Sequence, residues 1–295
     1  MPEKRAPERF FRPKRRFGQN FLIDRSVLSE IVERAAVAPD DVLLEVGPGE
    51  GVLTTALLLK GCARLHAVEL DFRLKDALER LQAQNPRLNV LWNDAVRADY
   101  GALSPFPNKV VANIPYSITT PLIWRLLAFA SRGLTYHLYM VQKEAMERLT
   151  APRDTKERYP LGVALEVMGT VALVRRVPPS CFRPAPRVDS ALVEIELKRN
   201  LFLTEDSLWS DLLHAGFHQR RKTLLNNLKG FRGRGLEEWQ GLMDRVKLDP
   251  RIRAEDLSGE EWLLLYDALY DALLSAGDRK TAAPVDPANG GVFPV

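Results

Sequence analysis

Short apolar runs alternate with amphipathic stretches along the first two thirds of the chain. The apolar runs are rich in β-branched residues, which is typical of buried strands, and they cover residues 42–46, 65–70, 88–92, 109–113 and 135–141. The segments between them repeat their apolar positions about every 3.6 residues, which predicts helices over 52–61, 73–82, 121–130 and 142–150. Two further strands are expected near 167–177 and 190–197.

Alternation of strands and helices in this order predicts an α/β fold, in which helices cover both faces of a parallel sheet. From residue 201 the pattern is helical throughout, with helices expected near 204–217, 219–229, 236–247 and 259–275. We therefore expect a sheet domain over 1–198, including a basic N-terminal segment, and a smaller all-helical domain over 199–276. Residues 277–295 have little to bury, which predicts a disordered tail.

The composition suits an intracellular protein. A chain of 295 residues can fold without a metal or a disulfide, and Cys62 and Cys181 form no CxxC pair, which suits a reducing compartment. The Arg-rich start lacks the apolar core of a signal peptide, and its acids and prolines argue against an organellar transit peptide. No stretch approaches the roughly 20 apolar residues of a membrane span. We expect a cytoplasmic monomer.

Positive charge is concentrated in two places, although the net charge is only +4. One cluster lies at 4–16, and the second, at 218–235, contains no acidic residue; both have phenylalanines among or beside the cations. This pattern favours binding to a phosphate backbone with a few stacked bases. A solvated helix face and a flexible tail are the alternative interpretation.

Polar side chains follow four successive predicted strands. They are Glu45 and the glycine loop after it, then Glu69, Asp94 and Asn113. Because the carboxyl ends of parallel strands meet at one edge of a sheet, where ligands bind, these side chains are expected to surround a common site.

The glycine loop has the spacing GxGxG, with Gly47, Gly49 and Gly51. Glycines allow a sharp turn and a close approach of backbone to ligand, although a lone motif of this kind also occurs in ordinary turns. Glu45 and Glu50 would repel a pyrophosphate, which argues against NAD or ATP. They would tolerate the sulfonium and ammonium of S-adenosylmethionine.

Two further acids fit the same cofactor. Glu69 lies about 20 residues after the loop, where an acid accepts hydrogen bonds from ribose hydroxyls. Asp94 can accept from the adenine amine, and the backbone N–H of Ala95 can donate to a ring nitrogen. The sequence Asn-Asp-Ala at 93–95 is also an ordinary turn sequence.

The run that ends in Asn113, Ile114, Pro115 and Tyr116 predicts a catalytic turn. Methylation of an exocyclic base amine requires the nitrogen lone pair to face the methyl carbon. The Asn113 side-chain oxygen and the Ile114 carbonyl would hold the two amine hydrogens, Pro115 would keep that carbonyl rigid, and Tyr116 would stack on the base. No strong general base is needed, but the base must leave its stack to reach the site.

Together the motifs resemble the ribosomal RNA adenine dimethyltransferases of the KsgA type. They are FGQNFL at 17–22, EVGPGEG at 45–51, NIPY at 113–116, VQKE at 141–144, FRPAPRVDS at 182–190 and QRRKT at 219–223. The resemblance implies a Rossmann-like class I methyltransferase sheet with S-adenosylmethionine as donor. It also implies dimethylation of two adjacent adenosines in the 3′-terminal hairpin of small-subunit rRNA, during biogenesis of the small ribosomal subunit.

The resemblance also implies roles for single residues. Gln19, Asn20 and Leu22 would line the cofactor entrance, and Phe182 would sandwich the target base against Tyr116; without the resemblance, Phe182 reads as a buried loop anchor. The RNA contacts would come from Arg220, Arg221 and Lys222. Two departures are Ser117, where the family usually has Asn, and the segment KERYPLGVAL at 156–165, interpreted as a loop without the family's usual pattern.

Other functions remain open at this point. An Erm-type enzyme would methylate a large-subunit adenosine and share most motifs, and a non-catalytic RNA-binding assembly factor could keep the fold. A DNA adenine methyltransferase would more often have Asp-Pro-Pro-Tyr at the catalytic turn. His214 and His218 lie four residues apart without a third ligand, so no metal is expected.

Overall fold

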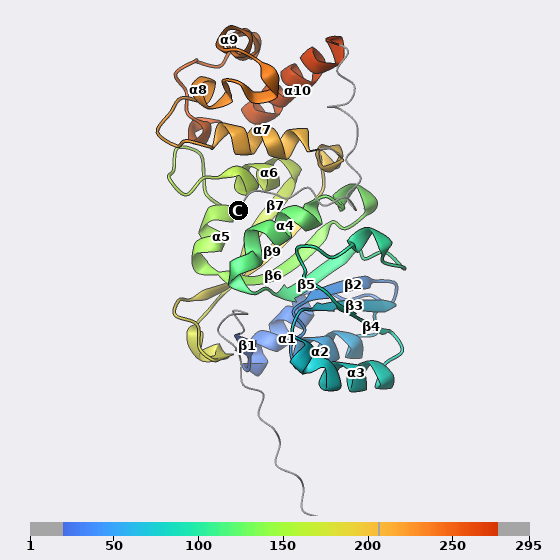
Figure 1. Cartoon of the computed structure of the whole chain (residues 1–295). Helices are drawn as coiled ribbons and strands as arrows, with labels where there is room; N and C mark the ends of the chain where they lie inside the picture. The colour runs from blue at the N-terminus through green and yellow to red at the C-terminus, as the bar shows by residue number, and fades with distance from the viewer. Residues whose placement is uncertain (1–19, 206, 277–295) are drawn as a thin grey trace, which may run out of the picture.

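A seven-stranded sheet forms the centre of the computed structural model, which describes residues 20–205 and 207–276 (Figure 1). Its strand order is β4-β3-β2-β5-β6-β9-β7. The strands are β2 (Val42–Val46), β3 (Arg64–Glu69), β4 (Leu88–Trp92), β5 (Lys109–Asn113), β6 (Tyr136–Gln142), β7 (Gly169–Val177) and β9 (Ser190–Leu197). The first five are parallel, as the alternating pattern predicted, whereas β9 runs antiparallel between β6 and β7.

Side chains of these strands alternate between two hydrophobic clusters, because successive residues of a strand point to opposite faces. Leu43 and Val111 belong to the cluster covered by α1 (Arg25–Arg34) and α2 (Val52–Leu59), with α3 (Lys75–Gln84) beside it. Their neighbours Leu44 and Val110 belong to the other cluster, with α4 (Thr119–Leu127), α5 (Lys143–Leu149) and α6 (Pro160–Met168). The sheet is thus covered by helices on both faces.

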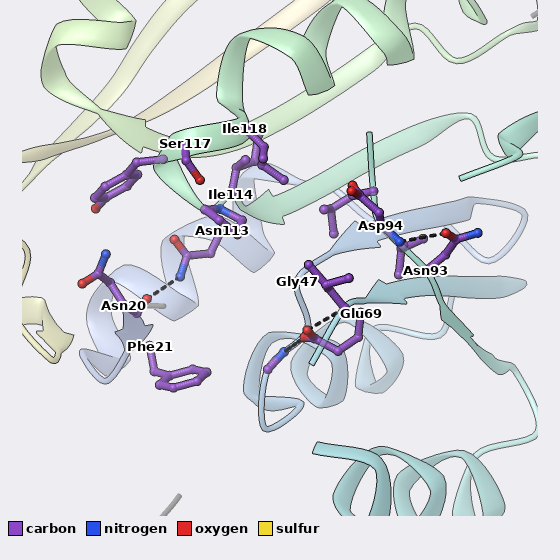
Figure 2. Close-up of a pocket in the computed structure, with 17 residues that line it drawn as sticks. Asn20, Phe21, Gly47, Glu69, Asn93, Asp94, Asn113, Ile114, Ser117 and Ile118 are labelled. Carbon is purple, nitrogen blue, oxygen red and sulfur yellow. Dashed lines mark hydrogen bonds between the residues drawn. The ribbon is translucent and has the colours of Figure 1, made fainter. Parts of the chain in front are cut away.

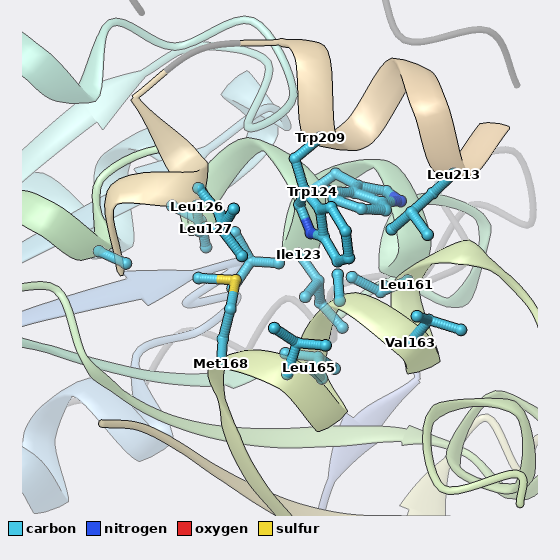
Figure 3. Packing of buried hydrophobic residues seen from close by; sticks show 14 of the residues in the cluster. Ile123, Trp124, Leu126, Leu127, Leu161, Val163, Leu165, Met168, Trp209 and Leu213 are labelled. Carbon is cyan, nitrogen blue, oxygen red and sulfur yellow. The ribbon is translucent and has the colours of Figure 1, made fainter. Parts of the chain in front are cut away.

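The C-terminal helices share the second of these clusters with the sheet. They are α7 (Leu208–Gly216), α8 (Leu224–Leu228), α9 (Leu236–Arg245) and α10 (Gly259–Ser275). Figure 3 shows Trp209 and Leu213 of α7 over Leu161 of α6 and Trp124 of α4. The cluster continues to the fully buried Trp239 and Trp262, so the helical part is anchored by burial of aromatic surface against the sheet side.

Short 3-10 helices and a small two-stranded ribbon complete the described residues. The ribbon consists of β1 (Phe21–Leu22) and β8 (Phe182–Arg183), which pair antiparallel. The short helices are η2 (Phe72–Leu74), η3 (Tyr100–Ala102), η4 (Tyr116–Ile118), η5 (Ala130–Arg132), η6 (Pro179–Cys181), η7 (Leu201–Thr204), η8 (Phe231–Gly233) and η9 (Ala254–Asp256).

The structure corrects three predictions. Residues 160–165, taken as part of a loop, and residues 167–168, taken as the start of a strand, form α6, because Pro160 stands at the first helical turn and nearly every following side chain is buried. The predicted helix 219–229 is only α8, since Thr223 caps its N-terminus and residues 219–222 form a turn. The predicted helix 204–217 begins at Leu208.

Two predictions fall on residues that the structure does not describe. They are the basic segment at the N-terminus and the tail after residue 276, which lie outside 20–205 and 207–276. Within the described ranges, none of the helices combines the length and the apolar character that crossing a membrane requires.

Candidate active site

A pocket of about 240 Å³ lies beyond the carboxyl ends of β2, β3, β4 and β5 (Figure 2). This is the edge at which ligands bind in doubly wound sheets. Its 17 lining residues come from the ends of those strands and the turns after them, and from Asn20 and the first residue of β1. They are Asn20, Phe21, Val46, Gly47, Gly49, Val68, Glu69, Leu70, Asn93, Asp94, Ala95, Asn113, Ile114, Pro115, Tyr116, Ser117 and Ile118.

Asn113, the last residue of β5, has a side chain of fixed orientation. Its Nδ2 donates to the backbone carbonyl of Asn20 at 2.9 Å. Because a carbonyl can only accept, this contact identifies which end of the amide is nitrogen and leaves Oδ1 directed away from Asn20 (Figure 2). The pocket therefore presents a held amide oxygen at the end of β5.

The turn after Asn113 is held from two sides. The Ile114 N–H donates to the carbonyl of Met140 on β6 at 3.2 Å, and Pro115 has φ −55° and ψ 125°. The Tyr116 hydroxyl and Ser190 Oγ, at the start of β9, share a hydrogen bond of 2.6 Å. Burial raises the pKa of Tyr116, so its half-buried phenol stays neutral at physiological pH.

The glycine loop packs tightly against the segment before α1. Gly47 and Gly49 have φ values of +71° and +58°, which L side chains rarely adopt. A Cβ on Gly49 would lie 2.7 Å from Cε1 of Phe21. Phe21 is thus a pocket residue that sequence reasoning did not assign, although the alternation of side chains along a strand distinguishes it from Leu22.

The carboxylate of Glu69 binds the glycine loop and the turn after β3. Its Oε2 accepts from the Gly49 N–H at 3.2 Å, and its Oε1 accepts from the N–H groups of Leu70 and Asp71, both at 2.8 Å. Burial nevertheless raises the pKa of Glu69. A carboxylate oxygen has two lone pairs, so Oε2 keeps one acceptor position for a ligand hydroxyl.

Asp94 and Ala95 line the pocket at the end of β4. One carboxylate oxygen of Asp94, Oδ1, accepts from the Val96 N–H at 2.9 Å. The Asn93 side chain accepts in turn from the Asp94 N–H at 2.8 Å. Residues 93–95 therefore form the expected turn, and the same residues line the pocket.

Glu45 is not among the lining residues. Its side chain is 1% exposed, and Oε2 has no hydrogen-bond partner within the described chain. Burial, together with the nearby charge of Glu69, raises the pKa of Glu45 to about 8. Burial thus favours the uncharged form of this carboxyl, and Glu45, which does not line the pocket, gives no support to the expectation that its charge repels a pyrophosphate there.

Two other residues assigned from the sequence are placed differently, and a third, Gln19, is not described by the structure. Leu22 packs against the cluster under α1. Phe182 is 3% exposed and belongs to the same cluster, so in this conformation its ring is the buried anchor of the alternative interpretation and does not face the pocket.

The predicted RNA-binding cations lie in the C-terminal helical part, between α7 and α8. Arg220, Arg221 and Lys222 are all exposed in the turn between α7 and α8. Asn227 holds this turn, because its Nδ2 donates to the carbonyls of Gly216 at 2.6 Å and Gln219 at 3.1 Å. The three cations are therefore presented on a fixed backbone.

His214 contributes to packing. Its Nδ1 is 2.7 Å from the carbonyl of Ser210, and its ring centroid is 5.3 Å from that of Trp124. Among residues 20–205 and 207–276, no three side chains of His, Cys, Asp or Glu are grouped closely enough to hold a metal ion.

The charge of the pocket identifies the kind of ligand it fits. Its described lining contains two acids, Glu69 and Asp94, and no lysine, arginine or histidine. A ligand rich in phosphate would meet only repulsion there, whereas a ligand with hydroxyls and positive charge would be favoured. The carboxylates of Glu69 and Asp94 suit the hydroxyls, the amine and the positive charge of S-adenosylmethionine.

Comparison with known proteins gives a consistent result. Residues 10–271 match the family model described as ribosomal RNA adenine dimethylase. The chain is 38% identical over 263 residues to the ribosomal RNA small subunit methyltransferase A of Chromobacterium violaceum, covering 88% of this chain and 96% of the relative. The protein of the same name from Clostridium botulinum is 34% identical over 269 residues, covering 89% and 96%.

Two solved structures share the whole arrangement. A dimethyladenosine transferase from Plasmodium falciparum has a TM-score of 0.70 and 25% identity, with 88% of this chain and 98% of that chain covered. The 23S rRNA methyltransferase ErmE has a TM-score of 0.61 and 25% identity, with 85% and 100% covered. The chain therefore belongs to the ribosomal RNA adenine dimethylase family and is an rRNA adenine dimethyltransferase.

Proposed function

We propose that the protein uses S-adenosylmethionine to dimethylate two adjacent adenosines in the 3′-terminal hairpin of small-subunit rRNA. The residues that would hold the cofactor are the loop of Gly47 and Gly49, with Glu69 at its ribose and Asp94 and Ala95 at its adenine. When bound, S-adenosylmethionine supplies a methyl group made electrophilic by the sulfonium. The acidic lining of the pocket supports this assignment.

The catalytic step is assigned to the turn from Asn113 to Tyr116. Asn113 Oδ1 and the Ile114 carbonyl would accept the two hydrogens of the target amine, which directs its lone pair toward the methyl carbon. The observation that carries this proposal is the hydrogen bond of 2.9 Å from Asn113 Nδ2 to Asn20. It fixes the amide with its oxygen available, before any substrate binds.

Tyr116 would stack on the target base. Its hydroxyl contact with Ser190 fixes the ring relative to β9, so that the base meets a surface of defined position. Because the methylated amine is acidic, its extra proton can pass to water without a strong base. The neutral phenol of Tyr116 adds no charge to that step.

The choice of small-subunit rRNA rests on the curated relatives. Their names specify the small subunit, at 34–38% identity over nearly their whole length. ErmE supports large-subunit rRNA as the second candidate, because 85% of this chain superimposes on it. We further propose that the enzyme acts as a cytoplasmic monomer on rRNA within the assembling small subunit.

The two parts of the chain are proposed to divide the work. Residues 1–198 would carry methyl transfer, since the described pocket lies within them. Residues 199–276 would bind rRNA through the exposed cations Arg220, Arg221 and Lys222. The shared cluster around Trp209 would keep the two parts in a fixed relation.

A labelling experiment tests the function. The protein is incubated with methyl-labelled S-adenosylmethionine and, separately, unmethylated small-subunit particles, large-subunit rRNA or DNA, and the label is mapped. Dimethyladenosine confined to the 3′ hairpin of small-subunit rRNA is the expected result. Label in large-subunit rRNA would replace the proposal with the second candidate, and cofactor binding without label would point to an RNA-binding assembly factor.

Asn113→Ala tests the catalytic turn in the same assay. Transfer is expected to fall by about a thousandfold, with cofactor and RNA affinity nearly unchanged. Asn85→Ala is the matched control, because Asn85 also donates through Nδ2 to a backbone carbonyl, that of Leu81, but lies outside the pocket. Loss of RNA binding or of folding in Asn113→Ala alone would show that the role of Asn113 is structural.

A further inference from the structure

Arg183 occupies a position on β8 that faces the pocket side of the small ribbon. In the antiparallel pair of β1 and β8, Arg183 stands opposite Phe21, and Phe182 stands opposite Leu22. Residues directly opposite each other in such a pair project from the same face. Since the ring of Phe21 lines the pocket, the side chain of Arg183 leaves the ribbon on the same face.

Burial of the neighbouring residues supports this orientation. Leu22 and Phe182, which form the other pair of the ribbon, both pack into the hydrophobic cluster under α1. Arg183, by contrast, is exposed. Because Arg183 pairs with Phe21, which lines the pocket, its backbone stands next to the N-terminal wall of the pocket.

The charge of Arg183 is not used within the described part of the chain. Arg34 and Arg175, which also lie near β1 and β9, form ion pairs with Glu194 and Glu30. No ion pair among residues 20–205 and 207–276 includes Arg183. An exposed guanidinium beside a pocket whose only charged lining residues, within the described chain, are Glu69 and Asp94 is therefore available to an anion outside the protein.

We propose that Arg183 binds a backbone phosphate next to the target adenosine while that base is inserted into the pocket. This inference rests on the proposed function. An inserted nucleotide brings two phosphates toward a pocket whose described lining contains two acids and no cation to balance the phosphate charge. A guanidinium binds phosphate through two parallel hydrogen bonds and balances that charge. Arg183 is thus a positioning residue, which acts on the RNA backbone and touches neither the methyl group nor the target amine.

The test uses Arg183→Gln and Arg183→Lys, with Arg80→Gln as the matched control. Arg80 is an exposed arginine on α3, outside the pocket. Affinity for unmethylated small-subunit particles is measured from 50 to 200 mM salt, conditions in which one lost phosphate contact changes the slope of log K against log salt by about 0.7–0.9. KM and kcat are measured for RNA, and cofactor affinity is measured without RNA.

Arg183→Gln is expected to reduce the slope of log K against log salt by about 0.7–0.9, the value for one phosphate contact, and to raise KM for RNA about tenfold. Little change is expected in kcat or in cofactor affinity. Arg183→Lys should keep the slope, because it keeps the charge, and Arg80→Gln should behave as the wild type. An unchanged slope and KM in Arg183→Gln would overturn the proposal. Reduced cofactor affinity without RNA would overturn it as well, since it would show a structural role.

These outcomes are separate from those that test the proposed function. The binding slope does not depend on which adenosine is methylated, or on whether methylation occurs. A wild-type enzyme that binds the particles but labels no small-subunit adenosine would refute the function, whereas the slope of Arg183→Gln decides the role of Arg183 in either case.

Discussion

Replacing Gly49 with alanine is expected to disturb both the glycine loop and the segment that lies on it. Gly49 has a φ of +58°, and an added Cβ would lie 2.7 Å and 3.0 Å from Cε1 and Cδ1 of Phe21. Ordinary contacts between carbon atoms are about 3.5–4.0 Å. The ring must therefore move, and it belongs to the same short segment whose Asn20 carbonyl holds the Asn113 amide.

Two costs add up in this variant. An L side chain in the left-handed region costs about 1 kcal/mol, and displacing a packed side chain costs about 1–2 kcal/mol more. We expect a loss of about 2–3 kcal/mol in the free energy of unfolding. Because Phe21 and Asn20 both line the pocket, the affinity for S-adenosylmethionine should fall about tenfold or more, which corresponds to about 1.4 kcal/mol.

Gly61→Ala is the matched control for this prediction. Gly61 has a φ of +93°, but no atom lies within 4 Å of its added Cβ. It therefore carries the backbone cost without the contact with Phe21. Urea unfolding and calorimetric titration of the cofactor are compared for the two variants. Equal losses of stability and unchanged cofactor affinity in both would refute the view that the fit between Gly49 and Phe21 maintains the pocket.

Three further predictions concern pH, the helical part and RNA. Glu45 has a pKa raised by burial from 4.5 to about 8, so between these pH values the folded protein holds a proton that the unfolded chain releases. The free energy of unfolding therefore falls with rising pH, by up to about 1.4 kcal/mol per pH unit. In urea unfolding at pH 5–8, Glu45→Gln should show a shallower fall than the wild type, and parallel plots of unfolding free energy against pH would contradict this. The side chain of Arg158 is 1% exposed and binds Glu166 and the carbonyls of Ala151 and Leu257. Arg158→Met should lower the free energy of unfolding by about 3 kcal/mol, measured by urea unfolding. A loss below about 1 kcal/mol would show that these contacts are dispensable. Replacing the three cations of the 220–222 turn with Gln should flatten the salt dependence of RNA affinity, and an unchanged slope would remove this turn from the RNA surface.

The strands of the sheet could be predicted because each is marked by a short run of apolar residues that are adjacent in the sequence. Runs such as 42–46 and 109–113 contain buried residues on both faces, and a parallel sheet with a helix after most strands is the arrangement that buries them. The ligand edge was predictable for the same reason. Once the strands are parallel, Glu69, Asp94 and Asn113 must gather at one end, as they do.

Features that depend on distant contacts were not predictable. Apolar residues of α6 follow one another without the spacing of one apolar helix face, and nearly all of them are buried in the cluster that also contains Trp209. The burial of Phe182 depends on its pairing with Leu22, about 160 residues away in sequence, so that contact cannot be read from periodicity. The raised pKa of Glu45 follows from burial in the folded chain, which the sequence does not display.

The acids of the pocket and the exposed cations outside it differ in the charge that they would attract. Acids inside the pocket favour a cationic cofactor and disfavour phosphate, so an RNA backbone gains nothing by entering. In the proposals above, the exposed cations, Arg183 beside the pocket and the 220–222 turn on the helical part, would attract that backbone from outside. An RNA held in this way can place in the pocket only a group without charge, which is an unstacked base. On these proposals, the separation of acidic interior and basic exterior would favour an extruded base over one that remains paired.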